Sequence, residues 1–256
     1  MLILPNGNRV GMISGGCLEG DLCRHAAALC EDGPRLISFD TRSDSINFNA
    51  RYNQGCSGII YVLVEPITKD SQCPLSVIRK TLETEKAMVV GTVYQSDGFP
   101  CFEVGARIDE VSSSASSQLQ DIFEQVSQSG KPICCQLVQS ASQENEQSAR
   151  IFVERVLPPK PIWIFGAGDD AIPISNVARE LGWAVTVIDD RAEFLTANRF
   201  PFTKRIRATH LEEFNNQLVP TPETAAILVS HSFTKDALLL PWLCTLDLAY
   251  VGLLGP

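Results

Sequence analysis

The sequence has no hydrophobic run long enough to span a membrane. Its apolar stretches fall far short of the roughly 18 residues that a transmembrane helix needs. Met1 is not followed by a basic region and an apolar leader, which mark a secretory signal. We therefore expect a cytoplasmic protein with no membrane partner.

The chain has fewer basic than acidic residues. The chain carries 21 Lys and Arg against 30 Asp and Glu, which gives a net charge of −9 at pH 7. Because a surface of this sign repels a phosphate backbone, we expect no nucleic-acid partner.

Paired cysteine motifs are also missing. None of the nine cysteines forms a CxxC pair, and no Cys/His cluster has the spacing of a zinc site. Without a secretory leader a disulfide framework is not expected. Most of the thiols are expected to be buried and reduced, acting as small hydrophobic groups.

A proline-rich segment, Leu157-Pro158-Pro159-Lys160-Pro161, marks the best domain boundary. Proline stiffens the backbone and cannot lie in a central strand. Residues 1–157 mix strands, turns and helices, which predicts a mixed α+β domain. Residues 161–256 alternate strand and helix, which predicts a Rossmann-like parallel sheet with helices on both faces. The predicted fold class is therefore α/β, in two domains.

Hydrophobic patterning places the main elements of the first domain. Helical spacing predicts a helix over Glu19 to Leu29, and a β-branched run predicts a strand over Ile59 to Val64. Strands over Ala87 to Tyr94 and Cys101 to Ile108 are expected to form a hairpin. The polar segment Gln139 to Ala149 lacks apolar periodicity and is predicted to be a loop or turn.

The second domain carries a glycine-rich turn. Gly166-Ala167-Gly168-Asp169-Asp170-Ala171 fits G-x-G-x-x-A, directly after a predicted strand and at the start of a predicted helix. Gly166 would allow the tight turn, and Gly168 would let a ligand approach the backbone. Asp189 ends the next predicted strand, where an acid can bind ribose hydroxyls.

Two acids argue against bound NAD at this turn. Asp169 and Asp170 stand at the helix N-terminus, where they would repel a pyrophosphate. The alternative is a Rossmann scaffold whose nucleotide site is altered or empty. His231 follows another strand end of this half, where ligands bind in open α/β sheets. A local helix-cap hydrogen bond with Asp236 is the structural alternative for His231.

Two glycine-flanked cysteines form the best candidate site of the first domain. Ser14-Gly15-Gly16-Cys17-Leu18-Glu19 joins a strand to a helix, and a thiolate at a helix N-terminus is stabilised by the dipole. Gln54-Gly55-Cys56-Ser57-Gly58 leads into a strand. We expect Cys17 and Cys56 to meet at one cleft with Glu19 nearby. By pattern alone, however, small residues packing tight turns explain both segments better.

Several motifs occur in the order typical of one family. They are ISGGCLEGDL, QGCSG, FVERVLPPKPIWIFGAGDDAIP, ELGWAVTVIDDR, VSHSFTKDAL and YVGLLG. Over nearly its whole length the chain therefore resembles the XdhC/CoxI family, accessory proteins for xanthine dehydrogenase and related molybdenum hydroxylases. It departs from the family in having GCSG for GCGG and Ser230 where the THxxxxD segment begins with threonine. Relatives also extend before Met1 and beyond Pro256, which indicates a fragment or a short member.

The resemblance implies a cofactor carrier rather than an enzyme. It implies that the protein binds molybdenum cofactor (molybdopterin), supports its sulfuration and delivers it to the apo-enzyme. The implied partners are the molybdenum hydroxylase apo-enzyme and a cysteine desulfurase, and we expect a homo-oligomer. Together with the motifs, it gives these cofactor-binding candidates, with Cys17 as the metal ligand: Gly15, Gly16, Cys17, Glu19, Cys56, Gly166, Gly168, Asp189 and His231.

Two other functions stay open. An NAD(P)-dependent oxidoreductase would use the Rossmann domain, but Asp169 and Asp170 and the lack of a convincing acid–base set weaken it. A thiol redox protein would use Cys17 or Cys56, but it lacks a CxxC motif. Fold analogy alone is a poor guide to chemistry.

Overall fold

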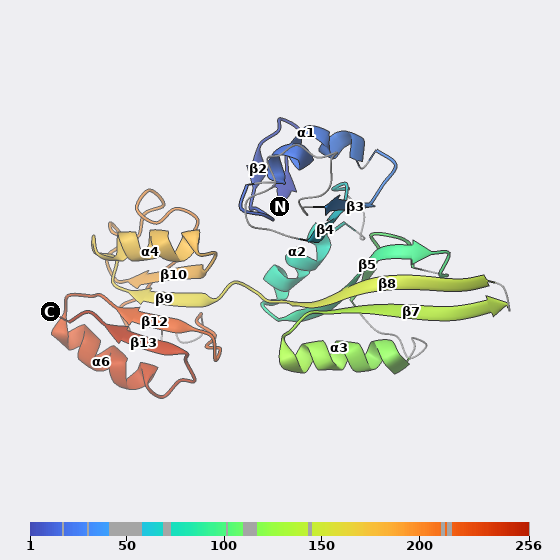
Figure 1. Ribbon diagram of the computed structural model, residues 1–256. Helices are drawn as coiled ribbons and strands as arrows, with labels where there is room; N and C mark the ends of the chain where they lie inside the picture. Colours follow the sequence, from blue (N-terminus) through green and yellow to red (C-terminus); the bar gives the residue numbers. More distant parts are fainter. Residues whose placement is uncertain are drawn as a thin grey trace. The chain divides into compact units, whose positions relative to one another are not determined.

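The chain forms two compact units, Met1–Pro158 and Pro159–Pro256, in a computed structural model (Figure 1). The structure describes residues 1–16, 18–29, 31–40, 58–68, 73–100, 102–109, 117–142, 145–210, 213 and 217–255. No helix among these residues has the length and apolar character needed to cross a bilayer.

The described residues of the first unit form two antiparallel pairs, one larger antiparallel sheet and three helices. In chain order these are β1 (Leu2–Ile3), β2 (Arg9–Val10), α1 (Glu19–Leu29), β3 (Arg35–Asp40), β4 (Ile59–Val64), α2 (Leu75–Thr84), β5 (Met88–Asp97), β6 (Arg107–Ile108), α3 (Ser117–Ser129), β7 (Ile133–Ser142) and β8 (Asn145–Val156). The predicted bounds of the helix α1 and the strand β4 are confirmed.

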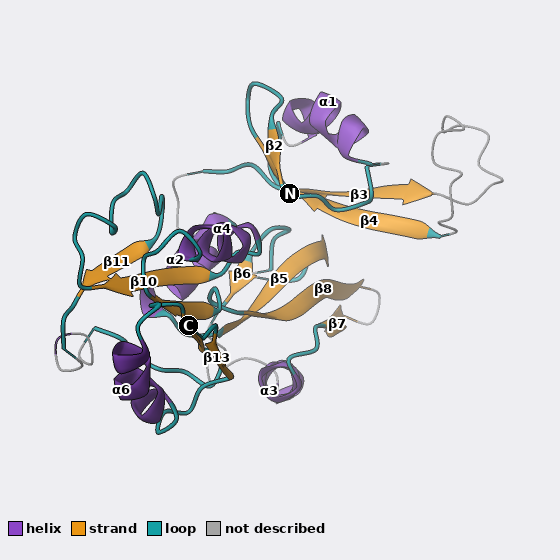
Figure 2. Cartoon of the chain, turned by 90° about the vertical axis from the view of Figure 1, so that its left-hand side faces the viewer, coloured by secondary structure: helices purple, strands orange, loops and turns teal. Residues whose placement is uncertain are grey.

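Helix α1 packs on the β3–β4 pair. Leu18 precedes the helix and Leu22 lies in its first turn, and both are buried with Phe39 of β3. Figure 2 shows this helix beside the β3–β4 ribbon. This packing fixes the start of α1. The glycine-rich turn of the first unit lies directly before that helix.

The larger sheet of this unit has the strand order β6-β5-β8-β7, with α3 against one face (Figure 1). Leu119 and Val126 stand seven residues apart on α3, so both face the sheet and are buried. They pack with Val93, Ile151 and Val153, which come from β5 and β8.

The structure corrects two predictions about this sheet. Residues 139–142 and 145–149 are not a loop or turn, because they belong to the paired strands β7 and β8, with Gln139 opposite Gln147. Antiparallel pairing is made by backbone groups, so the ladder continues where the side chains are polar. The hairpin expected from the segments 87–94 and 101–108 is confirmed in part, because β5 and β6 pair antiparallel at Gly91 and Thr92. Its turn does not lie at residues 96–98, because β5 runs on to Asp97 paired with β8.

The second unit is a parallel sheet. Its elements are β9 (Pro161–Phe165), α4 (Ala171–Glu180), β10 (Ala184–Asp189), β11 (Lys204–Arg207), β12 (Ala225–Leu228), α6 (Phe233–Leu243) and β13 (Tyr250–Leu253). The strand order is β11-β10-β9-β12-β13, and every neighbouring pair is parallel. The predicted Rossmann-like fold of this part is confirmed.

Side chains of β9 alternate between the two faces of this sheet. Ile162 and Ile164 join the core beneath α4, whereas Trp163 and Phe165 join the core beneath α6. Figure 1 shows the two helices on opposite faces. Because the chain goes from β9 outward through β10 and β11 and then returns to β12, a crevice opens at the carboxyl ends of β9 and β12.

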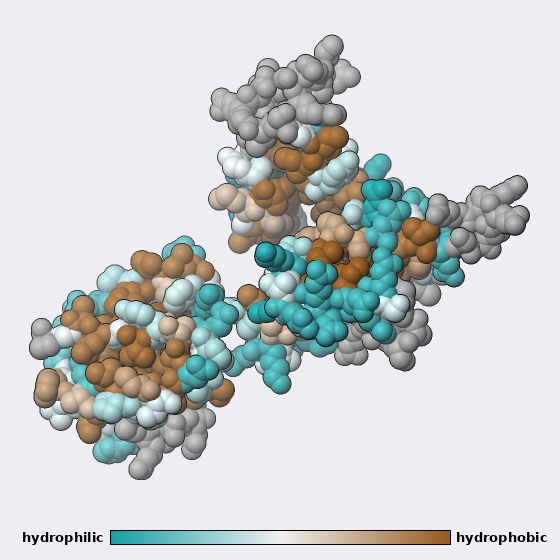
Figure 3. Space-filling view, turned by 60° about the horizontal axis from the view of Figure 1, so that its bottom comes forward, coloured by the Kyte–Doolittle hydropathy of each residue, from teal (hydrophilic) through white to brown (hydrophobic). Residues whose placement is uncertain are grey.

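Helix α6 is apolar on most of its surface. Leu243 is buried in the core, whereas Phe233 and Leu238 are mostly exposed. Figure 3 shows apolar side chains, in brown, over much of the visible face of this unit. Helix α6 therefore offers apolar side chains at the crevice as well as to the core.

Candidate functional site

The glycine-rich turn joins β9 to α4, as predicted. Gly166 has φ +115°, and a Cβ there would lie 2.5 Å from the carbonyl oxygen of Val229. Its N–H donates to the carbonyl of Ile188 at 2.8 Å. Only glycine fits this position, because both the backbone angle and the neighbouring strand exclude a side chain.

Gly168 has a different role. The nearest atom to a Cβ at Gly168 would be Cδ2 of His231, at 3.9 Å. The backbone here is therefore open, and a ligand could approach it closely. Gly168 and His231 lie together at the crevice.

Asp189 ties the end of β10 to the turn. Its Oδ2 accepts from the backbone N–H of Ala167 at 2.6 Å and from the Arg191 guanidinium at 2.9 Å. Its Oδ1 accepts from the backbone N–H and Nε of Arg191, each at 2.9 Å. Burial opposes ionisation, but the hydrogen bonds from Arg191 and Ala167 outweigh it and hold the pKa of Asp189 far below its ordinary value. Asp189 was predicted to bind ribose hydroxyls, but both of its carboxylate oxygens accept hydrogen bonds from the chain itself.

The two acids at the start of α4 each have a partner from another loop. Asp169 Oδ1 lies 2.8 Å from Nη2 of Arg199, and Asp170 Oδ2 lies 2.6 Å from Nε2 of His231. The two carboxylates predicted to repel a pyrophosphate thus lie at the helix N-terminus, each beside a nitrogen of another loop, and the repulsion itself stays a prediction.

Asp236 holds the loop that carries His231. Its Oδ1 accepts from the hydroxyl of Ser230 at 2.5 Å, and Asp236 is buried in the first turn of α6. The N-cap of α6 is Ser232, whose hydroxyl accepts from the backbone N–H of Lys235. The predicted cap thus belongs to Ser232, and His231 is left to bind Asp170.

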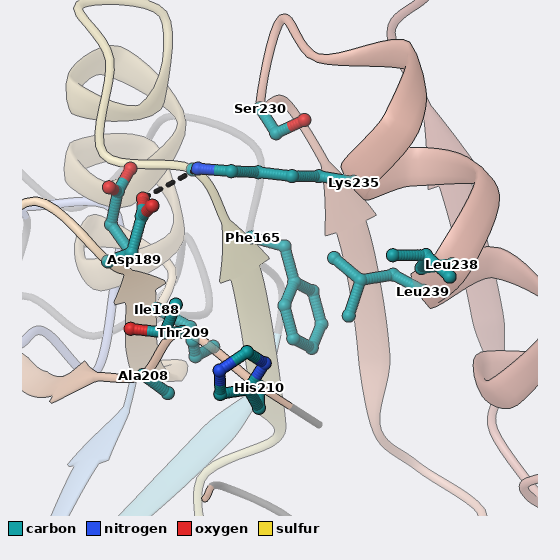
Figure 4. A pocket seen from close by; sticks show the side chains of 12 residues that line it. Phe165, Ile188, Asp189, Ala208, Thr209, His210, Ser230, Lys235, Leu238 and Leu239 are labelled. Carbon is teal, nitrogen blue, oxygen red and sulfur yellow. Dashed lines mark hydrogen bonds and ion pairs between the residues drawn. The ribbon is translucent and has the colours of Figure 1, made fainter. Parts of the chain in front are cut away.

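A pocket of about 540 Å³ lies at the carboxyl edge of the sheet (Figure 4). Lys235 reaches across it from α6, and its Nζ lies 2.6 Å from Oδ1 of Asp190. The pocket therefore combines an apolar floor with one ion pair. Its lining residues are Phe165, Gly166, Ile188, Asp189, Asp190, Ala208, Thr209, His210, Ser230, Lys235, Leu238 and Leu239.

The turn before α1 is organised by Glu19. This carboxylate is fully buried, and it accepts from the backbone N–H groups of Ile13 and Ser14 at 3.0 and 2.7 Å. It also accepts from the Ser14 hydroxyl at 2.6 Å. Burial would raise its pKa, but the hydrogen bonds from Ser14 and the backbone lower the pKa of Glu19 to about 2. Glu19 thus holds the turn in shape as an ionised residue.

The glycines of this turn are open to solvent. Gly15 and Gly16 would each have no atom within 4 Å of a Cβ, and Gly16 has φ +106°. Cys17 and Cys56, predicted to share a cleft with Glu19, lie outside the described residues, so their convergence stays a prediction.

A second cavity, of about 520 Å³, lies in the first unit and was not predicted. Its lining includes Tyr94, Cys134 and Arg150 on the sheet. Burial and the neighbouring Cys134 raise the pKa of Tyr94.

Cys134 and Cys135 are adjacent in β7 and so point to opposite faces. They are free thiols, and no described group of three or more His, Cys, Asp or Glu could hold a metal.

Several residues of the crevice escaped sequence reasoning. Asp190 directly follows the end of β10, and Lys235 lies in the first turn of α6, the helix after β12. Their positions near strand ends were the available signal. Arg199 has no such signal, because it lies in the long connection between β10 and β11. Its partner Asp169 is 30 residues away in the sequence.

Comparison with known proteins agrees with this geometry. Residues 162–256 match the XdhC Rossmann domain, and residues 1–40 match the XdhC and CoxI family. A probable xanthine dehydrogenase subunit of Bacillus subtilis (strain 168) is 28% identical over 256 residues, which cover 100% of this chain and 73% of that protein. A crystal structure of a xanthine dehydrogenase from Bacillus halodurans shares the fold, with a TM-score of 0.69 and 23% identity over 99% of this chain and 71% of that one. The chain belongs to the XdhC/CoxI family.

Proposed function

We propose that this protein is a maturation factor for xanthine dehydrogenase or a related molybdenum hydroxylase. It binds molybdenum cofactor, supports its sulfuration with a cysteine desulfurase, and delivers it to the apo-enzyme. Family membership supports the xanthine dehydrogenase client, since a relative that matches the full chain is a probable subunit of that enzyme.

The shape of the turn before α1 carries the proposal. Glu19 anchors the turn through three hydrogen bonds, while Gly15 and Gly16 leave its outer side open. A bulky pterin could therefore approach the backbone of a turn that keeps its shape. Glu19 itself is engaged with its own chain, so its role in the proposal is to position the turn.

Cys17 is the proposed ligand or sulfur-transfer residue. It lies between the open glycines and the first residues of α1, and a thiolate is favoured near a helix N-terminus. Molybdenum cofactor supplies a metal centre whose soft ligands include sulfur, and a thiolate suits such a metal. Cys56 is the second proposed residue.

The crevice of the second unit gives less support to an NAD(P)-dependent oxidoreductase. Two carboxylates, Asp169 and Asp170, stand where a pyrophosphate would meet the start of α4. The strand-end acid Asp189 is saturated by Ala167 and Arg191. Both features favour a carrier over a dehydrogenase that uses this turn.

Equilibrium dialysis of the full chain against molybdenum cofactor tests the proposal. Wild type is expected to retain the cofactor, and Cys17→Ser is expected to lose retention with unchanged thermal stability, because serine has nearly the same shape but is a poor donor to a soft metal. Cys56→Ser is expected to weaken retention. Cys244→Ser, at an exposed thiol in the second unit, is the matched control.

Two outcomes would count against the proposal. Equal retention by all four proteins would remove both cysteines from the site. A folded wild type that retains no cofactor, but carries bound NAD(P) when purified from a molybdopterin-producing host, would favour the oxidoreductase.

A further inference from the structure

One side of the pocket at the carboxyl ends of the second unit's strands is polar, and its acceptors and donor stand in a fixed sequence. Lys235 crosses the pocket above Phe165 (Figure 4). Its Nζ lies 2.6 Å from Oδ1 of Asp190. A carboxylate offers only acceptors and an ammonium only donors. Side by side, the pair presents two acceptor oxygens followed by a donor.

The rest of the pocket suits a flat ring. Phe165 and Ile188 form a buried floor, and Leu238 and Leu239 reach in from α6 (Figure 4). A volume of about 540 Å³ lies within the range of small-molecule sites. A heteroaromatic ring can bury its faces against these apolar side chains while its edge reaches the ion pair.

We propose that this pocket binds a 2-amino-4-oxopyrimidine ring, the fused ring that pterins and guanine share. The edge of that ring presents an amino donor, a ring N–H donor and a carbonyl acceptor. This order complements the two oxygens of Asp190 and the ammonium of Lys235, and the paired donors make a bidentate, charge-assisted contact with the carboxylate. Adenine offers an amino donor beside an unprotonated ring nitrogen, which a carboxylate oxygen repels.

Asp190 is the recognising acid, and its neighbour is not. Both oxygens of Asp189 accept bonds from Ala167 and Arg191 in the interior. The Asp190–Lys235 pair, in contrast, is partly exposed, with side-chain exposures of 30% and 44%. A pair of this kind contributes about 1 kcal/mol or less, so its two members can turn slightly to meet the edge of a ligand while they stay side by side.

The ring could come from a pterin or from a guanine nucleotide, and only the pterin is connected with the proposed maturation role. The pterin source rests on the proposed function, because molybdenum cofactor contains a pterin. The guanine source stands independently of it. The probes must therefore separate them.

Calorimetric titration of the full chain with 6-carboxypterin, GMP, AMP and XMP is the test. The three nucleotides share ribose and phosphate, so differences among them report on the ring alone. At least one of 6-carboxypterin and GMP is expected to bind about tenfold or more tightly than AMP, which is the effect of one good hydrogen-bond pair.

Asp190→Asn should shift the preference of the pocket from GMP toward XMP rather than abolish binding. The amide replaces one acceptor by a donor in the same shape, so affinity for GMP should fall about tenfold and affinity for XMP, which has a 2-oxo group, should rise. Lys235→Met should weaken the binding of both GMP and XMP, because the ring carbonyl of each ligand loses its hydrogen-bond donor. Asp247→Asn, at an exposed acid on the opposite end of the sheet, is the control and should change neither.

Equal affinities for GMP, AMP and XMP, or an unchanged preference in folded Asp190→Asn, would overturn the inference. Failure of both 6-carboxypterin and GMP to bind would also overturn it, while retention of molybdenum cofactor in the dialysis would leave the maturation role intact. Binding of GMP without 6-carboxypterin would uphold the pocket as a guanine site and remove its support for the maturation role.

Discussion

Nε2 of His231 and Oδ2 of Asp170 lie 2.6 Å apart, and this contact joins the loop after β12 to the N-terminus of α4. His231 adopts a left-handed backbone with φ 51°, which is uncommon outside glycine. Its ring also lies beside Gly168. The imidazole thus faces the helix end at which an anionic ligand would have to bind.

Asp170→Asn is expected to raise the affinity of the protein for pyrophosphate. The substitution removes a negative charge from the N-terminus of α4 and releases the His231 imidazole to meet an anion. An increase of about fivefold is expected at low salt, which corresponds to roughly 1 kcal/mol. Titration calorimetry with inorganic pyrophosphate measures it.

Asp247→Asn makes the same charge change at the amino end of the sheet and is the control for this experiment. It should leave pyrophosphate affinity unchanged. A rise of the same size in both variants would show that net charge alone is responsible.

Gly166→Ala is expected to destabilise the second unit by about 3 kcal/mol or more. A Cβ at this position would overlap the carbonyl of Val229 at 2.5 Å, and φ +115° strains any side chain. Chemical denaturation followed by tryptophan fluorescence measures the loss, because Trp163, Trp183 and Trp242 all lie in or against the cores of this unit.

Gly168→Ala is the matched control, because the nearest atom to its Cβ would be 3.9 Å away. It should change the free energy of unfolding by less than about 1 kcal/mol. If both alanines cost the same, the close approach of β9 to Val229 would not be the reason for glycine at 166.

Glu19→Gln is expected to destabilise α1 at neutral pH and to have little effect in acid. The folded pKa of Glu19 is about 2, against an ordinary value of 4.5. A carboxylate with a depressed pKa contributes stability that is fully present above the unfolded value and is lost as pH falls from 4.5 toward 2. Because one pKa unit corresponds to about 1.4 kcal/mol, the cost should be roughly 3 kcal/mol at pH 7, still about 1 kcal/mol at pH 3, and small only near pH 2 and below.

Hydrogen exchange of the α1 amides, compared with wild type at each pH, gives a local measure of this cost. Glu83→Gln, at an exposed position on α2, changes the same charge and should leave α1 protection unchanged. A cost that is equal at pH 7 and pH 2 would contradict the role assigned to the ionised carboxylate.

The sequence by itself determined the local elements. Glycine spacing after an apolar strand predicted the turn from β9 to α4, since only glycine tolerates the backbone that this turn requires. Helical spacing predicted α1 to the residue. These features follow from neighbours within a few positions, and the candidates Gly166, Gly168 and His231 were accordingly found together at one crevice.

Tertiary structure alone decided which groups meet. The polar ends of β7 and β8 pair because each strand supplies the other with backbone donors and acceptors, which no hydrophobic pattern records. Asp170 and His231 are 61 residues apart, and Asp190 and Lys235 are 45 apart. Each pair forms because the strand order places β9 between β10 and β12, so that their carboxyl ends meet at one edge. Whether a carboxylate is saturated, as at Asp189, or open to a ligand depends on such distant donors, and the sequence shows only that the acid is there.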